Sequence, residues 1–141
     1  MPRPSVRFGL IGYGAWGQHH AEAIAKTENA QLVAIAERSD SGRAAAREKH
    51  ADADVVEDYR TLVERDDLDV VDVVVPSHIH HEIALAVRSS GKHLLLEKPM
   101  CLSIPECDDV LRVAKENDRL GAVGHEFRLS SLWAKVYEMV Q

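Results

Sequence analysis

The sequence is poor in aromatic residues and cysteines and has no excess of positive charge. Aromatic residues make up only 5% of the 141 residues, so a core must consist mainly of Val, Leu, Ile and Ala. The two cysteines, Cys101 and Cys107, form neither a CxxC pair nor a set with a matching His pair, which argues against a disulfide framework and a zinc site. The formal net charge of −6 argues against nucleic acid as a partner, because phosphate recognition favours a basic face.

Long apolar runs are also missing. No stretch is long enough to span a bilayer, and the N-terminal residues lack the apolar core of a signal peptide. We therefore expect no membrane association and a cytoplasmic location. Apolar residues account for 45% of the sequence and charged residues for 28%, which is an ordinary balance for a globular protein. The length fits a single domain.

Strand-like and helix-like segments alternate along the whole chain. We predict strands at 6–11, 31–37, 54–56, 70–75, 93–96 and 120–123, and helices at 15–26, 41–49, 59–63, 79–89, 104–117 and 132–140. The strands are nearly continuous apolar runs, which is typical of a parallel sheet with helices on both faces. The sequence thus predicts an α/β fold with a doubly wound parallel sheet of strand order 3-2-1-4-5-6.

Three local features refine this prediction. Ser103 and Glu106, with Pro105 between them, predict a capping box at the start of a helix. Gly91 stands where a helix needs a C-terminal cap. Asp72 is a charge inside an apolar strand, which indicates either a group near a ligand or, as we favour, a carboxylate hydrogen-bonded at a helix–sheet boundary.

Three glycines follow the first strand in the pattern GxGxxG. Gly12 permits a tight turn, Gly14 lets a pyrophosphate approach the backbone, and Gly17 lets the next helix pack closely on the strand. The N-terminus of that helix would direct its free N–H groups at the phosphates. The pattern predicts a dinucleotide site. It comprises the glycines and the residues between them, Tyr13, Ala15 and Trp16.

Glu37 lies about twenty residues beyond Gly17, where a dinucleotide-binding fold places its ribose-binding acid. A carboxylate there accepts hydrogen bonds from the ribose hydroxyls and repels a 2′-phosphate, which favours NAD. The neighbouring Arg38 could pair with such a phosphate, so NADP remains possible. Two alternatives stay open at this point. Glu37 could be a solvated strand-end carboxylate, and the glycine loop could serve S-adenosylmethionine.

Lys98 follows the fifth strand. Open parallel sheets bind ligands at the carboxyl ends of their strands, so Lys98 is placed where a nicotinamide ring and its substrate would meet. Its amine could hydrogen-bond a substrate hydroxyl and stabilise the alkoxide that forms as hydride leaves, or it could relay a proton. The alternative is a surface lysine paired with Glu97.

Three segments carry a resemblance to a known family: GYGAWG at 12–17, VPSHIH at 75–80 and GKHLLLEKP at 91–99. Together they resemble the glucose–fructose oxidoreductase/inositol dehydrogenase/MocA family, and the resemblance covers the whole chain. It implies a Rossmann domain over residues 1–125. Residues 126–141 would then connect to a C-terminal α/β substrate domain that is absent from this sequence. Members oxidise or reduce sugars, cyclitols and related compounds with NAD or NADP.

The resemblance also assigns roles to single residues. Lys98 matches the family's catalytic lysine, Glu97 its neighbour in the motif, and Pro99 a proline that is often cis. Pro76 and His80 match residues that border the nicotinamide and the pyrophosphate.

Arg128 also matches an arginine that often follows the sixth strand. The match is incomplete elsewhere. The family commonly has Asn where this chain has Ser77, which shortens one cofactor contact. The family's second catalytic motif, an Asp and a His, lies in the C-terminal domain, and no residue here matches it. The resemblance therefore implies that the 141-residue chain binds cofactor with little or no turnover.

Other chemistry-bearing residues point to no further site. We expect no metal site, since no carboxylate or cysteine completes a ligand set with His78, His80 and His81. Nothing in the sequence supplies Cys101 with a base or a lowered pKa.

The first and last helices carry two further expectations. Trp16 is expected to cover the pyrophosphate turn. Either His19 or His20 should pack near the phosphate loop, with neither of them catalytic. The last predicted helix has an apolar stripe that Trp133 and Tyr137 widen, which indicates a surface for the absent domain or for another copy of the chain, and hence a possible homo-oligomer.

These observations lead to one functional prediction and one alternative. We predict the nicotinamide-binding half of an oxidoreductase that moves hydride to or from a secondary alcohol of a sugar or cyclitol. The alternative is a non-catalytic NAD(P)-binding protein with a regulatory or redox-sensing role.

Overall fold

The computed structural model describes residues 5–140. Its six strands form one parallel sheet of order β3-β2-β1-β4-β5-β6. The strands are β1 (Val6–Ile11), β2 (Ala30–Ala36), β3 (Asp54–Val56), β4 (Val70–Val73), β5 (His93–Glu97) and β6 (Gly121–Gly124). The predicted doubly wound α/β fold and its strand order are confirmed.

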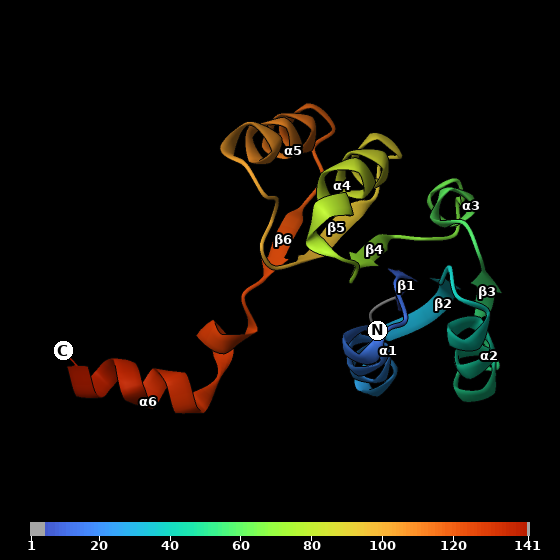
Figure 1. Cartoon of the computed structure of the whole chain (residues 1–141), viewed down its shortest axis with the longest axis horizontal. Coiled ribbons are helices and arrows are strands. Elements are labelled where there is room, and N and C mark those ends of the chain that lie inside the picture. The colour runs from blue at the N-terminus through green and yellow to red at the C-terminus, as the bar shows by residue number, and fades with distance from the viewer. Residues whose placement is uncertain (1–4, 141) are drawn as a thin grey trace.

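Helices cover both faces of this sheet (Figure 1). One face carries α1 (Ala15–Lys26) and α2 (Asp40–Lys49), and the other carries α3 (Tyr59–Val63), α4 (His80–Ser89) and α5 (Ile104–Glu116). Two 3₁₀ helices, η1 (Ser77–Ile79) and η2 (Glu126–Leu129), and a last helix, α6 (Ser131–Val140), complete the described chain. Ligands of such a sheet bind where the strand order reverses, which here is between β1 and β4.

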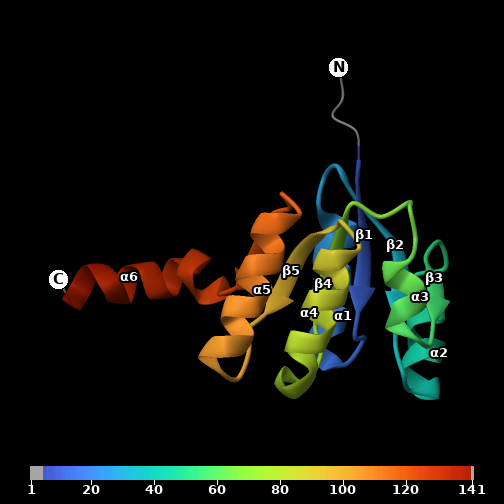
Figure 2. The same cartoon turned by 90° about the horizontal axis from the view of Figure 1, so that it is seen from above.

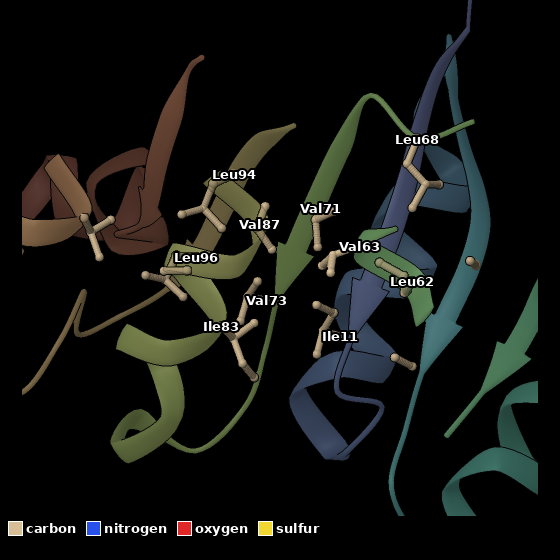
Figure 3. Packing of buried hydrophobic residues seen from close by; sticks show 14 of the residues in the cluster. Ile11, Leu62, Val63, Leu68, Val71, Val73, Ile83, Val87, Leu94 and Leu96 are labelled. Atoms are coloured by element: carbon tan, nitrogen blue, oxygen red, sulfur yellow. The ribbon is translucent and has the colours of Figure 1, made fainter. Parts of the chain in front are cut away.

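The core has two layers because side chains alternate across each strand. Ile11 of β1 belongs to the cluster beneath α3 and α4, whereas Leu10 belongs to the cluster beneath α1 and α2. Figure 3 shows the first cluster, in which Val71 and Val73 of β4 face Val87 and Ile83 of α4. Burial on both faces explains why the strands read as continuous apolar runs.

Several predicted boundaries are wrong by one or two residues at the edge where the strands end. The strand predicted to reach Val75 ends at Val73, and β2 ends at Ala36, before Glu37. The helix predicted from Ile79 begins instead as the 3₁₀ turn η1, where the Ile79 N–H donates to the Pro76 carbonyl. Val74 and Val75 extend the apolar run past β4 because they line the adjoining cavity, so composition alone placed them in the strand.

The last helix leaves the body of the domain. Figures 1 and 2 show α6 projecting beyond the β6 edge of the sheet. Every residue of α6 is exposed, and its Trp133 ring lies 5.9 Å from that of Phe127 in η2. Across residues 5–140, the structure contains no helix with the length and apolar character that a bilayer crossing requires.

Candidate cofactor-binding site

The glycine loop between β1 and α1 has no room for side chains at two positions. Gly12 has a φ of 95°, and a Cβ there would lie 2.1 Å from the Val74 carbonyl oxygen. A Cβ at Gly17 would lie 2.1 Å from the Gly12 carbonyl oxygen. The predicted tight turn and close packing of α1 on β1 therefore both require glycine here.

Gly14 differs because it faces open space. It is the N-cap of α1, and no atom lies within 4 Å of the place its Cβ would take. No side chain caps α1, and its first turn holds no acidic residue. The free N–H groups of Ala15 and Trp16 and the positive end of the helix dipole are left for an anion.

Glu37 stands at the end of β2 beside this loop. One carboxylate oxygen accepts a hydrogen bond from the Tyr13 N–H at 2.8 Å. The other accepts from the N–H and the hydroxyl of Ser39, at 2.8 and 2.7 Å. Partial burial alone would raise the pKa of Glu37, but these hydrogen bonds and the charge of Arg43 lower it below its ordinary value. The site thus holds a fixed negative charge.

A cavity of about 670 Å³ connects these features. Its size falls within the range of small-molecule and cofactor sites. Its lining includes five residues that the sequence predicted to bind the cofactor: Gly12, Gly14, Glu37, Arg38 and Pro76. The structure therefore brings the phosphate loop, the strand-end acid and the loop after β4 around one space.

The opposite wall of the cavity was missed by sequence reasoning. Tyr59 and Arg60 of α3 meet Glu82 of α4 there: the Tyr59 hydroxyl donates to Glu82 at 2.7 Å and the Arg60 guanidinium donates to it at 2.9 Å. Burial and the Glu82 carboxylate raise the pKa of Tyr59 to about 12. No local motif signals this wall, because its residues come from two helices that only the tertiary structure brings together.

Lys98 follows β5 and is exposed. The Lys98–Pro99 peptide bond is cis, in agreement with the resemblance. The preceding Glu97 is buried and accepts the Lys98 backbone N–H at 3.1 Å and the Trp16 indole N–H at 3.0 Å. Within residues 5–140 the Lys98 amine forms no salt bridge, so Glu97 contacts the backbone of Lys98 rather than its ammonium group.

His80 lies behind the cavity wall instead of in it. Its side chain is fully buried, and its two ring nitrogens lie 2.7 Å from the Pro99 carbonyl oxygen and 2.9 Å from that of Val75. The ring therefore joins the loop after β4 to the turn that carries Lys98. Ser77 begins η1 in the same loop.

Trp16 and His20 show a contact that the sequence did not reveal. The Trp16 indole reaches Glu97 on β5, and His20, one turn further along α1, lies beside Trp16 and bonds to Asp72 at 2.8 Å. Both histidines pack beside Trp16 of the loop, with ring centroids 5.4 Å away for His19 and 6.3 Å away for His20. Asp72 is hydrogen-bonded between a helix and the sheet, which is the interpretation that we favoured.

The remaining candidates take no part in this arrangement. Burial raises the pKa of the Cys101 thiol to about 11, the opposite of what a nucleophile needs. His81 lies 3.3 Å from Asp109 on α5. In the described part of the chain, no group of His, Cys, Asp or Glu side chains is arranged to hold a metal ion.

Comparison with known proteins decides the family. A model of an oxidoreductase family with an NAD-binding Rossmann fold matches residues 6–125. The chain belongs to the Gfo/Idh/MocA family. The resemblance read from the three sequence segments is therefore confirmed.

Members of the family share this domain at moderate identity. The chain is 30% identical over 121 residues to a 2,7-anhydro-N-acetylneuraminate hydratase from Mediterraneibacter gnavus, covering 86% of this chain and 32% of the hydratase. It superposes with a TM-score of 0.90 and 27% identity on apo scyllo-inositol dehydrogenase from Lactobacillus casei, covering 99% of this chain and 42% of that one. A variant 3-ketoreductase from Actinomadura kijaniata, in complex with TDP-benzene and NADP, gives a TM-score of 0.88 at 28% identity, covering 96% and 43%.

These comparisons establish two points about the chain. The expected nicotinamide dinucleotide is confirmed at the level of NAD(P), since this Gfo/Idh/MocA family is NAD-binding and a structural neighbour holds NADP. The chain also spans less than half the length of these relatives.

Proposed function

We propose that this chain is the dinucleotide-binding part of an oxidoreductase that acts on a secondary alcohol of a cyclitol or sugar, with NAD preferred over NADP. The observation that carries the proposal is the uncapped start of α1, which opens beside a fixed carboxylate on one cavity. A bound nicotinamide would supply the hydride acceptor or donor.

The residues around the cavity fit such a cofactor. The backbone at Gly12 and Gly14 and the first N–H groups of α1 would hold the pyrophosphate. Tyr13 and Ser39 donate three hydrogen bonds to the Glu37 carboxylate, which leaves about one of its four lone-pair sites to accept a hydrogen bond from an adenosine ribose hydroxyl. Its negative charge would disfavour a 2′-phosphate, while the exposed Arg38 beside it could pair with such a phosphate.

Lys98 would be the residue of this chain that takes part in the chemical step. When the alcohol is oxidised, the neutral Lys98 amine would accept the hydroxyl proton as hydride leaves the carbon. In the reverse direction its ammonium group would stabilise the negative charge that develops on the carbonyl oxygen as hydride is added, and would return the proton to that oxygen. Pro76 and Ser77 would border the nicotinamide, and His80 would hold their loop against the Lys98 turn.

Substrate recognition would involve more than these residues. Residues 126–141 would lead into a substrate domain, a proposal supported by the exposed apolar side chains of η2 and α6, such as Leu129 and Met139. The 141-residue chain would then bind dinucleotide with little or no turnover, because a misplaced substrate alone can cost orders of magnitude in rate.

A binding titration tests the cofactor site. The fluorescence of Trp16 or calorimetry should report association of NADH more tightly than of NADPH. Glu37→Gln should weaken NADH binding by roughly 10-fold, because a charge-assisted hydrogen bond contributes about 1.5–3 kcal/mol. Glu28→Gln, at an exposed position on the same protein, should leave the affinity unchanged. Failure of the folded chain to bind either dinucleotide would contradict the proposal.

A turnover assay tests the chemistry. In a protein that includes the substrate domain, a panel of polyols should show dehydrogenation that Lys98→Met lowers by about 100-fold or more in kcat, with NADH affinity retained. Dinucleotide binding without turnover of any polyol in that longer protein would instead favour the regulatory or redox-sensing alternative.

A further inference from the structure

A buried cluster of three titratable side chains lies on the α1 side of the sheet, outside the cavity. His20 of α1 stands between two carboxylates: its Nδ1 is 2.8 Å from Asp72 of β4, and its Nε2 is 3.2 Å from Glu97 of β5. The side chains of Asp72, Glu97 and His20 are 1%, 8% and 18% exposed. Apolar packing alone does not explain why three ionisable side chains contact one another here.

The hydrogen bonds fix how many protons the cluster holds. An ionised carboxylate only accepts hydrogen bonds, and a neutral imidazole has a single N–H donor. Two contacts from one ring to two carboxylates therefore require two protons among the three groups. Either His20 is an imidazolium between two carboxylates, or it is neutral and one carboxyl group is protonated.

The surroundings favour retention of the second proton. The hydrogen bond to Asp72 raises the pKa of His20, although partial burial opposes this. Burial raises the pKa of Asp72 against the influence of His20. The groups that face the His20 ring are Asp72 from β4, Glu97 from β5 and Trp16 from its own helix. Trp16 is uncharged, so the two carboxylates set the charge around the ring.

Glu97 connects this cluster to Lys98. One of its carboxylate oxygens lies within hydrogen-bond distance of both His20 and the Trp16 indole. The other accepts the Lys98 backbone N–H at 3.1 Å. On its remaining side β6 packs so closely that a Cβ at Gly124 would lie 3.0 Å from Glu97. The orientation of Glu97, and with it the turn at Lys98, thus depends on the donors supplied by α1.

We propose that His20 is a positioning residue for Lys98: its protonated ring, anchored on Asp72, holds Glu97 in the orientation that fixes the Lys98 backbone beside the cofactor site. The inference rests on the proposed role of Lys98 in turnover. The same helix that opens toward the pyrophosphate then also sets the position of the amine, which couples cofactor binding and chemistry through α1.

Histidine side-chain NMR on the 141-residue chain tests the proton without any ligand. Between about pH 5 and 9, His20 should remain doubly protonated to a pH above the ordinary histidine pKa of 6.5. Asp72→Asn should lower the pH at which His20 loses its proton. If Asp72→Asn did not change the pH at which His20 loses its proton, the proposal would be overturned.

The amide resonance of Lys98 tests the positioning. Its N–H donates to Glu97, so its chemical shift should follow the His20 titration, and its hydrogen exchange should quicken in His20→Gln. A control on the same helix, Lys26→Gln at an exposed position, should change neither. A purely structural role would lower stability without linking the Lys98 amide to the His20 proton, so an unlinked Lys98 amide would also overturn the proposal.

Kinetics of a protein with the substrate domain separate this inference from the proposed function. His20→Gln should lower kcat by roughly 10-fold and alter its pH profile, with the KM for dinucleotide within about twofold of the original value. An equal loss in Lys26→Gln, or an effect on KM alone, would contradict the positioning role. Absence of dinucleotide binding by the unaltered protein would instead contradict the proposed function. The ligand-free NMR measurements would still test whether His20 positions Lys98.

Discussion

Two helix starts in this domain are built in opposite ways. At the start of α5, the Glu106 N–H donates to the Ser103 hydroxyl at 3.4 Å, and the Glu106 carboxylate accepts the Ser103 N–H at 3.0 Å. At the start of α1, Gly14 supplies no side chain and no acid follows in the first turn. Both starts follow a strand of the same sheet, so the difference is not imposed by the fold.

At the start of α5 the chain itself supplies hydrogen-bond partners for the free backbone N–H groups. At the start of α1 those N–H groups are left for a ligand. A Ser, Asp or Asn cap typically stabilises a helix by about 1 kcal/mol, and α2 and α3 have such caps in Ser39 and Asp58. With Gly14 as its N-cap, the α1 start lacks a side-chain cap and gives up about a few tenths of a kcal/mol, and it does so beside a cavity with a fixed carboxylate. Departures from local rules of this kind are expected at functional sites.

The largest expected effect comes from capping α1. Gly14→Asp should raise stability by about a few tenths of a kcal/mol, since the position has room for a side chain and an extended backbone that suits an N-cap. The same carboxylate would meet the pyrophosphate and should weaken NADH binding by about 100-fold. Thermal unfolding and calorimetry on one sample measure both changes.

A neutral capping residue distinguishes the effect of the negative charge on NADH binding from the effect of side-chain size. Gly14→Asn should retain the gain in stability and lose less affinity than Gly14→Asp. If Gly14→Asp bound NADH normally, the α1 start would not be the phosphate site.

Removing the cap of α5 should have a smaller effect, confined to stability. Ser103→Ala should lower the free energy of unfolding by about 1 kcal/mol, which corresponds to roughly 3–5 °C in Tm for a domain of this size. Ser103→Asp should restore most of the loss. NADH affinity should remain within twofold throughout, and a marked loss of affinity would show that the two helix starts are not independent.

The smallest expected effect is a dependence of stability on pH that involves α1 and not α5. The pKa values of His20 and Asp72 are raised in the folded state, so the folded protein holds protons that the unfolded chain releases. His20 therefore contributes stability that is fully present below its ordinary pKa of 6.5 and is lost as pH rises through its raised value. Chemical denaturation from pH 6 upward should show this decline.

Two variants identify the source of that decline. His20→Gln should flatten the part of the profile that begins near the ordinary histidine pKa, whereas Ser103→Ala should lower the whole profile without changing its slope. A decline of the same size in His20→Gln would assign the pH dependence to other groups.

Several features that the sequence predicted are local in sequence. The tight turn at Gly12 and the capping box of α5 each lie within a few residues of the backbone they serve. The wrong boundaries at Val75 and Glu37 have the opposite origin: whether a residue after a strand stays in the ladder depends on neighbouring strands, as when the Val74 N–H donates to Ile11.

The amino-acid sequence by itself determined the alternation of strands and helices, the two glycine positions with no room for a side chain, and the family. Those depend on backbone sterics and short-range periodicity, which a linear pattern records. Only the tertiary structure decided that Tyr59 and Glu82 close the cavity and that His20 sits between Asp72 and Glu97. These contacts join residues far apart in the chain, and they arise because parallel strands in the order β2-β1-β4-β5 bring the ends of separate segments to the same edge.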